Sequence, residues 1–270
     1  MNQNINTVYK KHIGKCALCG KKTELTFEHI PPRSAFNSSP AKPVTLETIL
    51  KSERHYPRQK QLLPYTNQQK GLGLFSLCKS CNENTGSWYG DAYYHFAKNS
   101  MEVISSDIDD GFNCVEFYNM YPLRIIKQII SMFCSVNVNT KLDDLREFVL
   151  NKESIGIDKN RYKICMYFTK STTCRHSGMT GLLDIKTSNV TLLSEIVYRP
   201  LGLLLYLNAD DSIKTEGIDI TSFANYSYDD VCNIKLPLSF KEVNNWLPHD
   251  YRTAEEIEIA IKKAESDFEK

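Results

Sequence analysis

Two pairs of cysteines carry the clearest chemical signal in this sequence. Cys16 and Cys19 form one Cys-x-x-Cys knuckle, and Cys78 and Cys81 form a second. Each pair can direct two thiolates at one ion, and two pairs complete the tetrahedron that zinc prefers. Residues 20–77 lie between the knuckles, which is more than a simple zinc ribbon uses. The spacing predicts a structural zinc site with an insertion between its halves; the alternative is four buried thiols without a ligand.

Three polar side chains flank this zinc site. Glu28 and His29 end one segment of the insertion, and Asn82 follows the last cysteine directly. Carboxylate and amide oxygens suit Mg²⁺, and a histidine can activate water near neutral pH. A metal ion in turn stabilises charge that develops on a phosphate. If zinc brings the two segments together, the set predicts metal-assisted hydrolysis of a phosphodiester.

The three segments CALCG (16–20), FEHIPP (27–32) and LCKSCNENTG (77–86) together resemble the HNH endonuclease family, over residues 12–98. The resemblance implies a ββα-metal nuclease fold that cleaves DNA. It also implies that His29 is the general base and that Glu28 and Asn82 are ligands of a catalytic Mg²⁺ or Mn²⁺. The text TGSWYG is similar to a bacterial subgroup associated with mobile elements or phage defence, which implies an antiviral role by analogy.

Two positions depart from the family pattern. The middle asparagine, which braces the base histidine, is missing from Gly71–Leu77, and Asn67 is the nearest candidate. Thr85 stands where a lysine or arginine commonly contacts phosphate. Basic residues of the insertion could make that contact or could be solvated loop charges; they are Arg33, Arg54, Arg58, Lys60 and Lys70.

Charge is distributed unevenly along the chain. Residues 1–70 hold 12 Lys and Arg against 4 Asp and Glu, so +8, while the remainder holds 21 against 28, so −7; together these recover the net +1. A basic front half favours a polyanionic partner, here DNA, although a solvated basic face gives the same count. The choice between DNA and RNA stays open.

The front half is expected to contain strands at 23–29 and 72–77 and a helix at 81–98, joined by an irregular excursion with a short helix over 44–53. The helix carries aromatic residues that could stack on bases but that helical spacing favours as core: Trp88, Tyr89, Tyr93 and Tyr94. The acidic segment Asp107–Gly111 predicts a boundary between a nuclease domain, 1–110, and a second domain, 111–270.

The back half is predicted to be α+β. Helices are expected from Pro122, over 142–150, and at the end of the chain, where Thr253 and Glu256 have capping-box spacing. Strands are expected at 161–169, 181–186, 190–198 and 201–207, and the predicted core residues are Met166, Phe168, Leu193, Val197 and Leu204. No motif gives this half a role; regulation, partner binding and dimerisation stay open.

The remaining sequence limits the class of protein. We find no signal peptide and no apolar run long enough to span a membrane, which predicts a cytoplasmic protein. In that compartment nine cysteines favour metal over disulfides. The five cysteines outside the knuckles are expected in the core: Cys114, Cys134, Cys165, Cys174 and Cys232. No chemical role is predicted for His12, His55, His95, His176 or His249.

Two alternatives to a nuclease remain from the sequence. The first is a zinc-stabilised nucleic-acid-binding module without catalysis, which would need neither Glu28 nor His29. The second is an interaction protein in which the nuclease segment is a relic, and the missing middle asparagine keeps this interpretation open.

Overall fold

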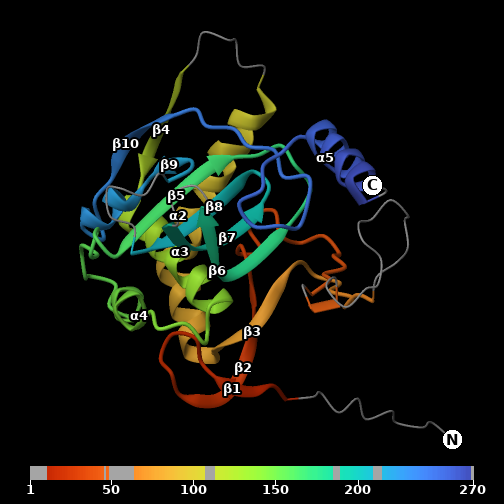
Figure 1. The fold of residues 1–270 in the computed structure, drawn as a ribbon. Coiled ribbons are helices and arrows are strands. Elements are labelled where there is room, and N and C mark those ends of the chain that lie inside the picture. Colours follow the sequence, from red (N-terminus) through yellow and green to blue (C-terminus); the bar gives the residue numbers. More distant parts are fainter. Residues whose placement is uncertain are drawn as a thin grey trace, which may run out of the picture.

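The structure is a computed structural model that describes residues 11–45, 47–48, 64–106, 113–184, 189–208 and 215–268. Helices and antiparallel strands are both abundant, which confirms the predicted α+β class (Figure 1). In the part of the chain so described, no helix is long and apolar enough to cross a membrane.

The first sheet has three antiparallel strands in the order β1-β2-β3. They are β1 (Ile13–Lys15), β2 (Lys22–His29) and β3 (Gly73–Cys78), and both longer strands lie where the sequence predicted them. The β2–β3 register shifts between Thr26 and Phe27. Ser76 is the extra residue, so this bulge helps to set which side chains of β3 face the interior.

Helix α2 (Lys79–Ser105) begins directly after β3 and extends beyond the predicted end at residue 98. It packs along α3 (Pro122–Val136), whose Pro122 stands in the first turn as expected. Helix α4 (Asp143–Leu150) packs on α3 and corresponds to the helix predicted at 142–150. Almost every side chain of α3 is buried, so this helix forms the centre of the molecule.

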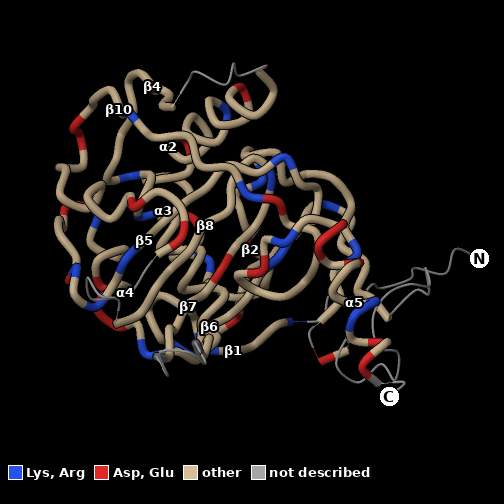
Figure 2. The backbone as a smooth tube through the Cα atoms, turned by 45° about the horizontal axis from the view of Figure 1, so that its top comes forward, with Lys and Arg blue, Asp and Glu red and all other residues tan. Residues whose placement is uncertain are grey.

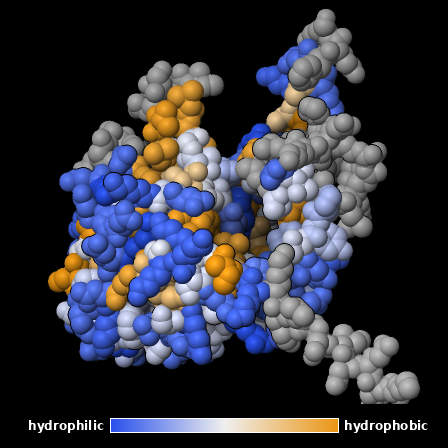
Figure 3. All heavy atoms as spheres, turned by 90° about the horizontal axis from the view of Figure 1, so that it is seen from below, coloured by the Kyte–Doolittle hydropathy of each residue, from blue (hydrophilic) through white to orange (hydrophobic). Residues whose placement is uncertain are grey.

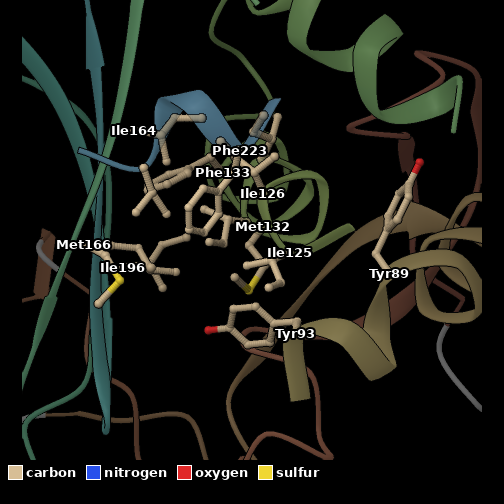
Figure 4. Packing of buried hydrophobic residues seen from close by; sticks show 14 of the residues in the cluster. Tyr89, Tyr93, Ile125, Ile126, Met132, Phe133, Ile164, Met166, Ile196 and Phe223 are labelled. Atoms are coloured by element: carbon tan, nitrogen blue, oxygen red, sulfur yellow. The ribbon is translucent and has the colours of Figure 1, made fainter. Parts of the chain in front are cut away.

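The second sheet has five strands in the order β6-β7-β8-β5-β9. These are β5 (Tyr162–Phe168), β6 (Arg175–Asp184), β7 (Asn189–Tyr198), β8 (Leu201–Leu207) and β9 (Ile218–Asp219). Strand β6 starts earlier than the predicted 181–186, because cross-strand pairing with β7 includes the polar residues Arg175, His176 and Ser177, which give no local strand signal. Ile164, Met166 and Ile196 of this sheet pack against Phe133 of α3 (Figure 4).

All five predicted core residues are fully buried, but they lie on two faces. Met166 and Phe168 join the main cluster with α3, whereas Leu193, Val197 and Leu204 belong to a smaller cluster on the other face of the five-stranded sheet. Alternation along a strand explains the division. Both faces of this sheet are therefore covered.

Three elements lie outside those predicted from the sequence: the paired strands β4 (Cys114–Met120) and β10 (Cys232–Pro237), and the short 3-10 helix η1 (Thr221–Asn225). At the end of the chain lies α5 (Ala254–Phe268). Its capping box is confirmed: Thr253 N–H donates to Glu256 Oε2 at 2.8 Å, and Glu256 N–H donates to Thr253 Oγ1 at 3.2 Å.

The proposed domain boundary at Asp107–Gly111 falls outside the described residues, as does most of the helix expected at 44–53. On either side of that boundary, one apolar cluster contains Cys16 and Tyr89 together with Phe133 and Leu203. The front and back halves therefore share buried contacts through α2 and α3.

Candidate metal centre and catalytic residues

The four knuckle cysteines lie together. The sulfur atoms of Cys16, Cys19, Cys78 and Cys81 are all within 4.8 Å of one another, so they could hold one metal ion. The first pair occupies the turn between β1 and β2, and the second pair spans the end of β3 and the start of α2. Strand pairing of β2 with β3 brings these sequence-distant turns to one place.

Local geometry favours the thiolate form of Cys16. Gly20 has φ +72°, which lets the first knuckle turn tightly, and the Cys78 backbone N–H donates to Cys16 Sγ at 3.3 Å. The pKa of Cys16 is lowered to about 4, chiefly by a hydrogen bond from the Cys81 thiol and also by the Cys78 N–H. Thiolates are the form that ligates a metal.

Arg146, from the back half of the chain, forms a hydrogen bond to the backbone of the first knuckle. Arg146 of α4 is almost fully buried, and its Nε donates to the carbonyl oxygen of Ala17 at 2.8 Å. Its Nη2 donates to the carbonyls of Val138 and Thr140 at 3.1 and 2.9 Å. No local pattern in the sequence indicates this contact, since Arg146 and Ala17 lie far apart along the chain. The knuckle is thus tied to the α3–α4 connection.

His29 lies at the end of β2 with a defined orientation. Its Nε2 is 2.9 Å from the carbonyl oxygen of Lys70, and its ring meets Phe27 edge-on at 5.1 Å between centroids. A carbonyl can only accept, so Nε2 carries the proton and Nδ1 keeps its lone pair. Nδ1 of His29 is therefore the nitrogen that could accept a proton from water.

Glu28 faces the opposite side of β2 from His29, as alternation along a strand requires. Its side chain is buried, and Oε2 accepts hydrogen bonds from Ser76 at 3.0 Å and from Ser135 of α3. Burial raises the pKa of Glu28 to about 7, although both serine hydroxyls act in the other direction. The structure thus places the Glu28 carboxyl between β3 and α3, not beside the His29 ring.

Asn82 lies in the first turn of α2 and contacts β2. Its Nδ2 donates to Thr26 Oγ1 at 2.9 Å and to the carbonyl oxygen of Phe27 at 3.3 Å. Because both bonds use the amide nitrogen, Oδ1 is the atom that remains for a cation. Asn82 also lines a shallow recess of about 370 Å³ with Thr26, Lys79 and Glu83. Glu83 is a second acidic oxygen source that the sequence analysis did not single out.

Asn37 ties the segment that follows His29 to the start of β3. It is fully buried, and its Nδ2 donates to the carbonyls of Pro31 and Leu72, both at 2.7 Å, while Oδ1 accepts from Leu72 N–H at 2.7 Å. Gly71 has φ +106°, and a Cβ there would lie 2.2 Å from the Asn37 carbonyl oxygen. The segment after His29 is thereby fixed to the start of β3. Asn67 does not take this place.

The predicted phosphate contacts can be followed only in part. Arg33 and Lys70 are exposed near the ends of the two strands, whereas Arg54, Arg58 and Lys60 lie outside the described residues. Basic and acidic residues are interspersed over the described part of the chain (Figure 2). Thr85 is buried, and its hydroxyl donates to the Cys81 carbonyl at 3.0 Å, which is a contact within the helix.

The core prediction for the aromatic residues of α2 is confirmed for two of the four. Tyr89 and Tyr93 are buried, and Tyr89 O–H donates to the Val149 carbonyl at 2.7 Å. Trp88 and Tyr94 are half-buried.

Among the other cysteines, Cys134 and Cys165 are core residues, Cys114 and Cys232 are half-buried, and Cys174 is exposed, so the core prediction is wrong for Cys174.

Comparison with known proteins gives no match at the family, curated-protein or solved-structure level.

Proposed function

We propose that this protein is a metal-dependent endonuclease of the HNH type, with a structural zinc on Cys16, Cys19, Cys78 and Cys81. Four clustered sulfurs form a donor set that suits zinc and leaves no open position for substrate, so the ion would have a structural role. In this proposal the zinc fixes the turn before β2 to the start of α2. The chemistry is then performed by residues of β2 and α2.

The observation that carries the proposal is the orientation of His29. The Lys70 carbonyl holds Nε2 at 2.9 Å, so that Nδ1 is the free acceptor, as a general base requires. Asn37 fixes Pro31, two residues after His29, and so limits movement of the strand end. A bound Mg²⁺ or Mn²⁺ would supply stabilisation of the negative charge on the phosphate.

Asn82 is the proposed ligand of the catalytic ion, through Oδ1. Glu28 would need to leave its two serine partners before it could ligate an ion near His29. Glu83 lines the recess beside Asn82 and offers a carboxylate without such a rearrangement. We therefore assign His29 and Asn82 to the reaction. Glu28 is a ligand of the catalytic ion only if its carboxyl moves away from the two serines.

The buried position of Glu28 also favours the alternative of a zinc-stabilised nucleic-acid-binding module without catalysis. Cleavage of plasmid DNA separates the two functions. A nuclease should cut in Mg²⁺ or Mn²⁺ and stop when a chelator removes the weakly held ion, whereas a binding module should retard DNA in a gel and leave it intact.

His29→Ala tests the base directly. We expect this variant to fold and to keep its zinc, while cleavage falls by roughly two to four decades, the usual contribution of general-base catalysis. Cleavage rates should be measured beside melting curves and zinc content.

His95→Ala is the matched control, since His95 is exposed on α2, 13 residues or about 20 Å along the helix from Asn82. It should cut like the wild type. A stable His29→Ala protein that cuts at the wild-type rate would end the proposal. For Asn82→Ala, added Mg²⁺ or Mn²⁺ should restore part of the lost rate.

A further inference from the structure

A row of aromatic rings lies on the outer face of the small sheet and ends at His29. Phe27 and Phe75 are directly opposite each other on β2 and β3, with ring centroids 5.4 Å apart. His12, just before β1, stacks on Phe75 with centroids 3.5 Å apart and planes 11° from parallel. Phe27 then meets His29 edge-on. Four rings from three segments are thus continuous with the proposed catalytic histidine.

The outer rings of this row are accessible. Phe75 keeps 43% of its surface exposed, and His12 is exposed as well. Figure 3 shows the end of the molecule that contains β1 as mainly hydrophilic, with small separate apolar patches. Ile13 and Leu74 of the same small sheet are exposed as well, and exposed apolar side chains that gather in one place are typical of interaction sites.

The backbone holds the rings rigidly. The carbonyl oxygen of His12 accepts a hydrogen bond from Leu25 N–H at 2.7 Å, which extends the β1–β2 pairing to His12. Opposite His29 stands Gly73, where a Cβ would lie 2.8 Å from the Phe27 ring. Glycine at this position lets the Phe27 ring cover the strand. A preorganised ring loses little entropy when a ligand stacks on it.

Positive charge lies on the same small sheet. Lys15, Lys21 and Lys22 are exposed around the turn between β1 and β2, and only Glu24 and the buried Glu28 carry negative charge on β2. Exposed lysines beside aromatic rings match a ligand that has a charged backbone and flat bases.

We propose that the stacked pair His12–Phe75 is a platform for an unpaired nucleobase, so that the substrate is single-stranded nucleic acid or the unpaired part of a duplex. The inference rests on the proposed nuclease function and names its substrate class. Bases within a duplex present only their edges, whereas stacking on a side chain requires a free base face. The row of rings would then lead the strand toward His29. The sequence had placed the stacking candidates on α2, where Tyr89 and Tyr93 are buried.

Binding of short labelled oligonucleotides to the full chain tests the platform. Fluorescence anisotropy should be measured without Mg²⁺ or Mn²⁺, so that cleavage does not interfere, using single-stranded DNA and RNA and a duplex of the same sequence. Wild type should prefer the single strands. Phe75→Ala should weaken their binding about tenfold, the lower range for one stacked base, and should leave duplex binding nearly unchanged. Phe75→Trp should retain the affinity.

Leu74→Ala is the matched control, because Leu74 is the next residue on β3, is similarly exposed at 38%, and points to the other face. It should bind like wild type. If Phe75→Ala does not fold, His12→Ala gives the same test from the edge of the sheet. Equal affinity of wild type and the ring variants for single strands, or a wild-type preference for duplex, would overturn the platform.

Cleavage is measured separately, in Mg²⁺ with wild-type protein. Absence of cleavage together with ring-dependent binding would refute the nuclease function and leave the platform. Cleavage together with unchanged binding by the ring variants would refute the platform and leave the nuclease.

Discussion

The three-stranded sheet and the five-stranded sheet each contain a buried glutamate, and the two glutamates are accommodated differently. Among the described residues, the hydrogen-bond partners of Glu28 on β2 are the hydroxyls of Ser76 and Ser135. Glu195 of β7 is fully buried in the five-stranded sheet and forms an ion pair with Arg175, with Nη2 and Oε2 2.6 Å apart. A buried carboxyl can be stabilised either by taking up a proton or by a buried cation.

Several donors besides Arg175 surround the Glu195 carboxyl. The hydroxyls of Tyr167 and Tyr251 donate to Glu195 Oε1 at 2.8 and 2.9 Å. The backbone N–H of His249 donates to Glu195 Oε2 at 3.1 Å. Arg175 also donates to the carbonyls of Leu247 and Asn245. The ion pair therefore fixes the segment before α5 to the outer face of the large sheet.

The five-stranded sheet and the small sheet also differ in how their faces are packed. The five-stranded sheet is packed on both faces by apolar side chains. The small sheet packs on one face, through Leu77, and leaves Phe75 exposed on the other. A sheet with one uncovered face has less core to stabilise it, and a metal ion on the four sulfurs would supply stabilisation that packing does not. We expect the metal to matter most for the small sheet.

Cys16→Ala should have the largest effect. Loss of one thiolate removes most of the metal affinity, which for structural zinc sites is on the order of 10 kcal/mol of folding free energy. Zinc content should fall and amide hydrogen exchange in β1–β3 should accelerate. Cys174→Ala, at an exposed cysteine outside the cluster, should change neither. A Cys16→Ala protein with wild-type exchange in β2 would contradict the role of the metal in ordering this sheet.

Arg175→Ala should rank second. It leaves the buried Glu195 charge without its cation, and breaking a buried pair costs about 3 to 5 kcal/mol. The free energy of unfolding from urea titration measures this loss. Arg161→Ala removes a partly exposed ion pair with Asp144 and should cost less than about 1 kcal/mol. Similar losses in the two variants would show that the buried pair contributes no more than a surface pair.

Glu28→Gln should have the smallest effect, and its sign depends on pH. The folded state raises the Glu28 pKa from 4.5 to about 7 and so holds a proton that the unfolded state has released between these values. Wild-type stability from this group therefore falls as pH rises from 4.5 through 7. Glutamine does not titrate, so the variant should gain on wild type across this window, by about 3 kcal/mol above pH 7.

Urea titrations of both proteins at pH 5.5 and pH 8 measure that difference, and protonation of the knuckle thiols cancels because both proteins share it. A stability difference that is the same at both pH values would mean that Glu28 is not held as a buried neutral acid. The same variant tests the ligand role of Glu28: a large loss of cleavage in a stable protein would restore Glu28 to the catalytic metal site.

Local patterns in the sequence determined the parts of the structure that depend on short spacing. Each Cys-x-x-Cys pair, the β-forming run that ends at His29, and the capping box of Thr253 all specify geometry within a few residues. Such features were predictable because the interacting groups are neighbours in the chain. The clustering of the two knuckles was also predictable, since four thiols at this spacing have a common ligand.

Tertiary structure alone decided what the side chains around His29 face. Alternation states that Glu28 and His29 point to opposite sides of β2, but only packing of α3 makes one side the interior and gives Glu28 the Ser135 hydroxyl. Asn37 reaches Leu72 across the long insertion, and His12 meets Phe75 across the sheet. Glu28 and Ser135 are 107 positions apart in the sequence, Asn37 and Leu72 are 35 apart, and His12 and Phe75 are 63 apart. No local pattern encodes such pairs, because they form only when the strands and helices have packed.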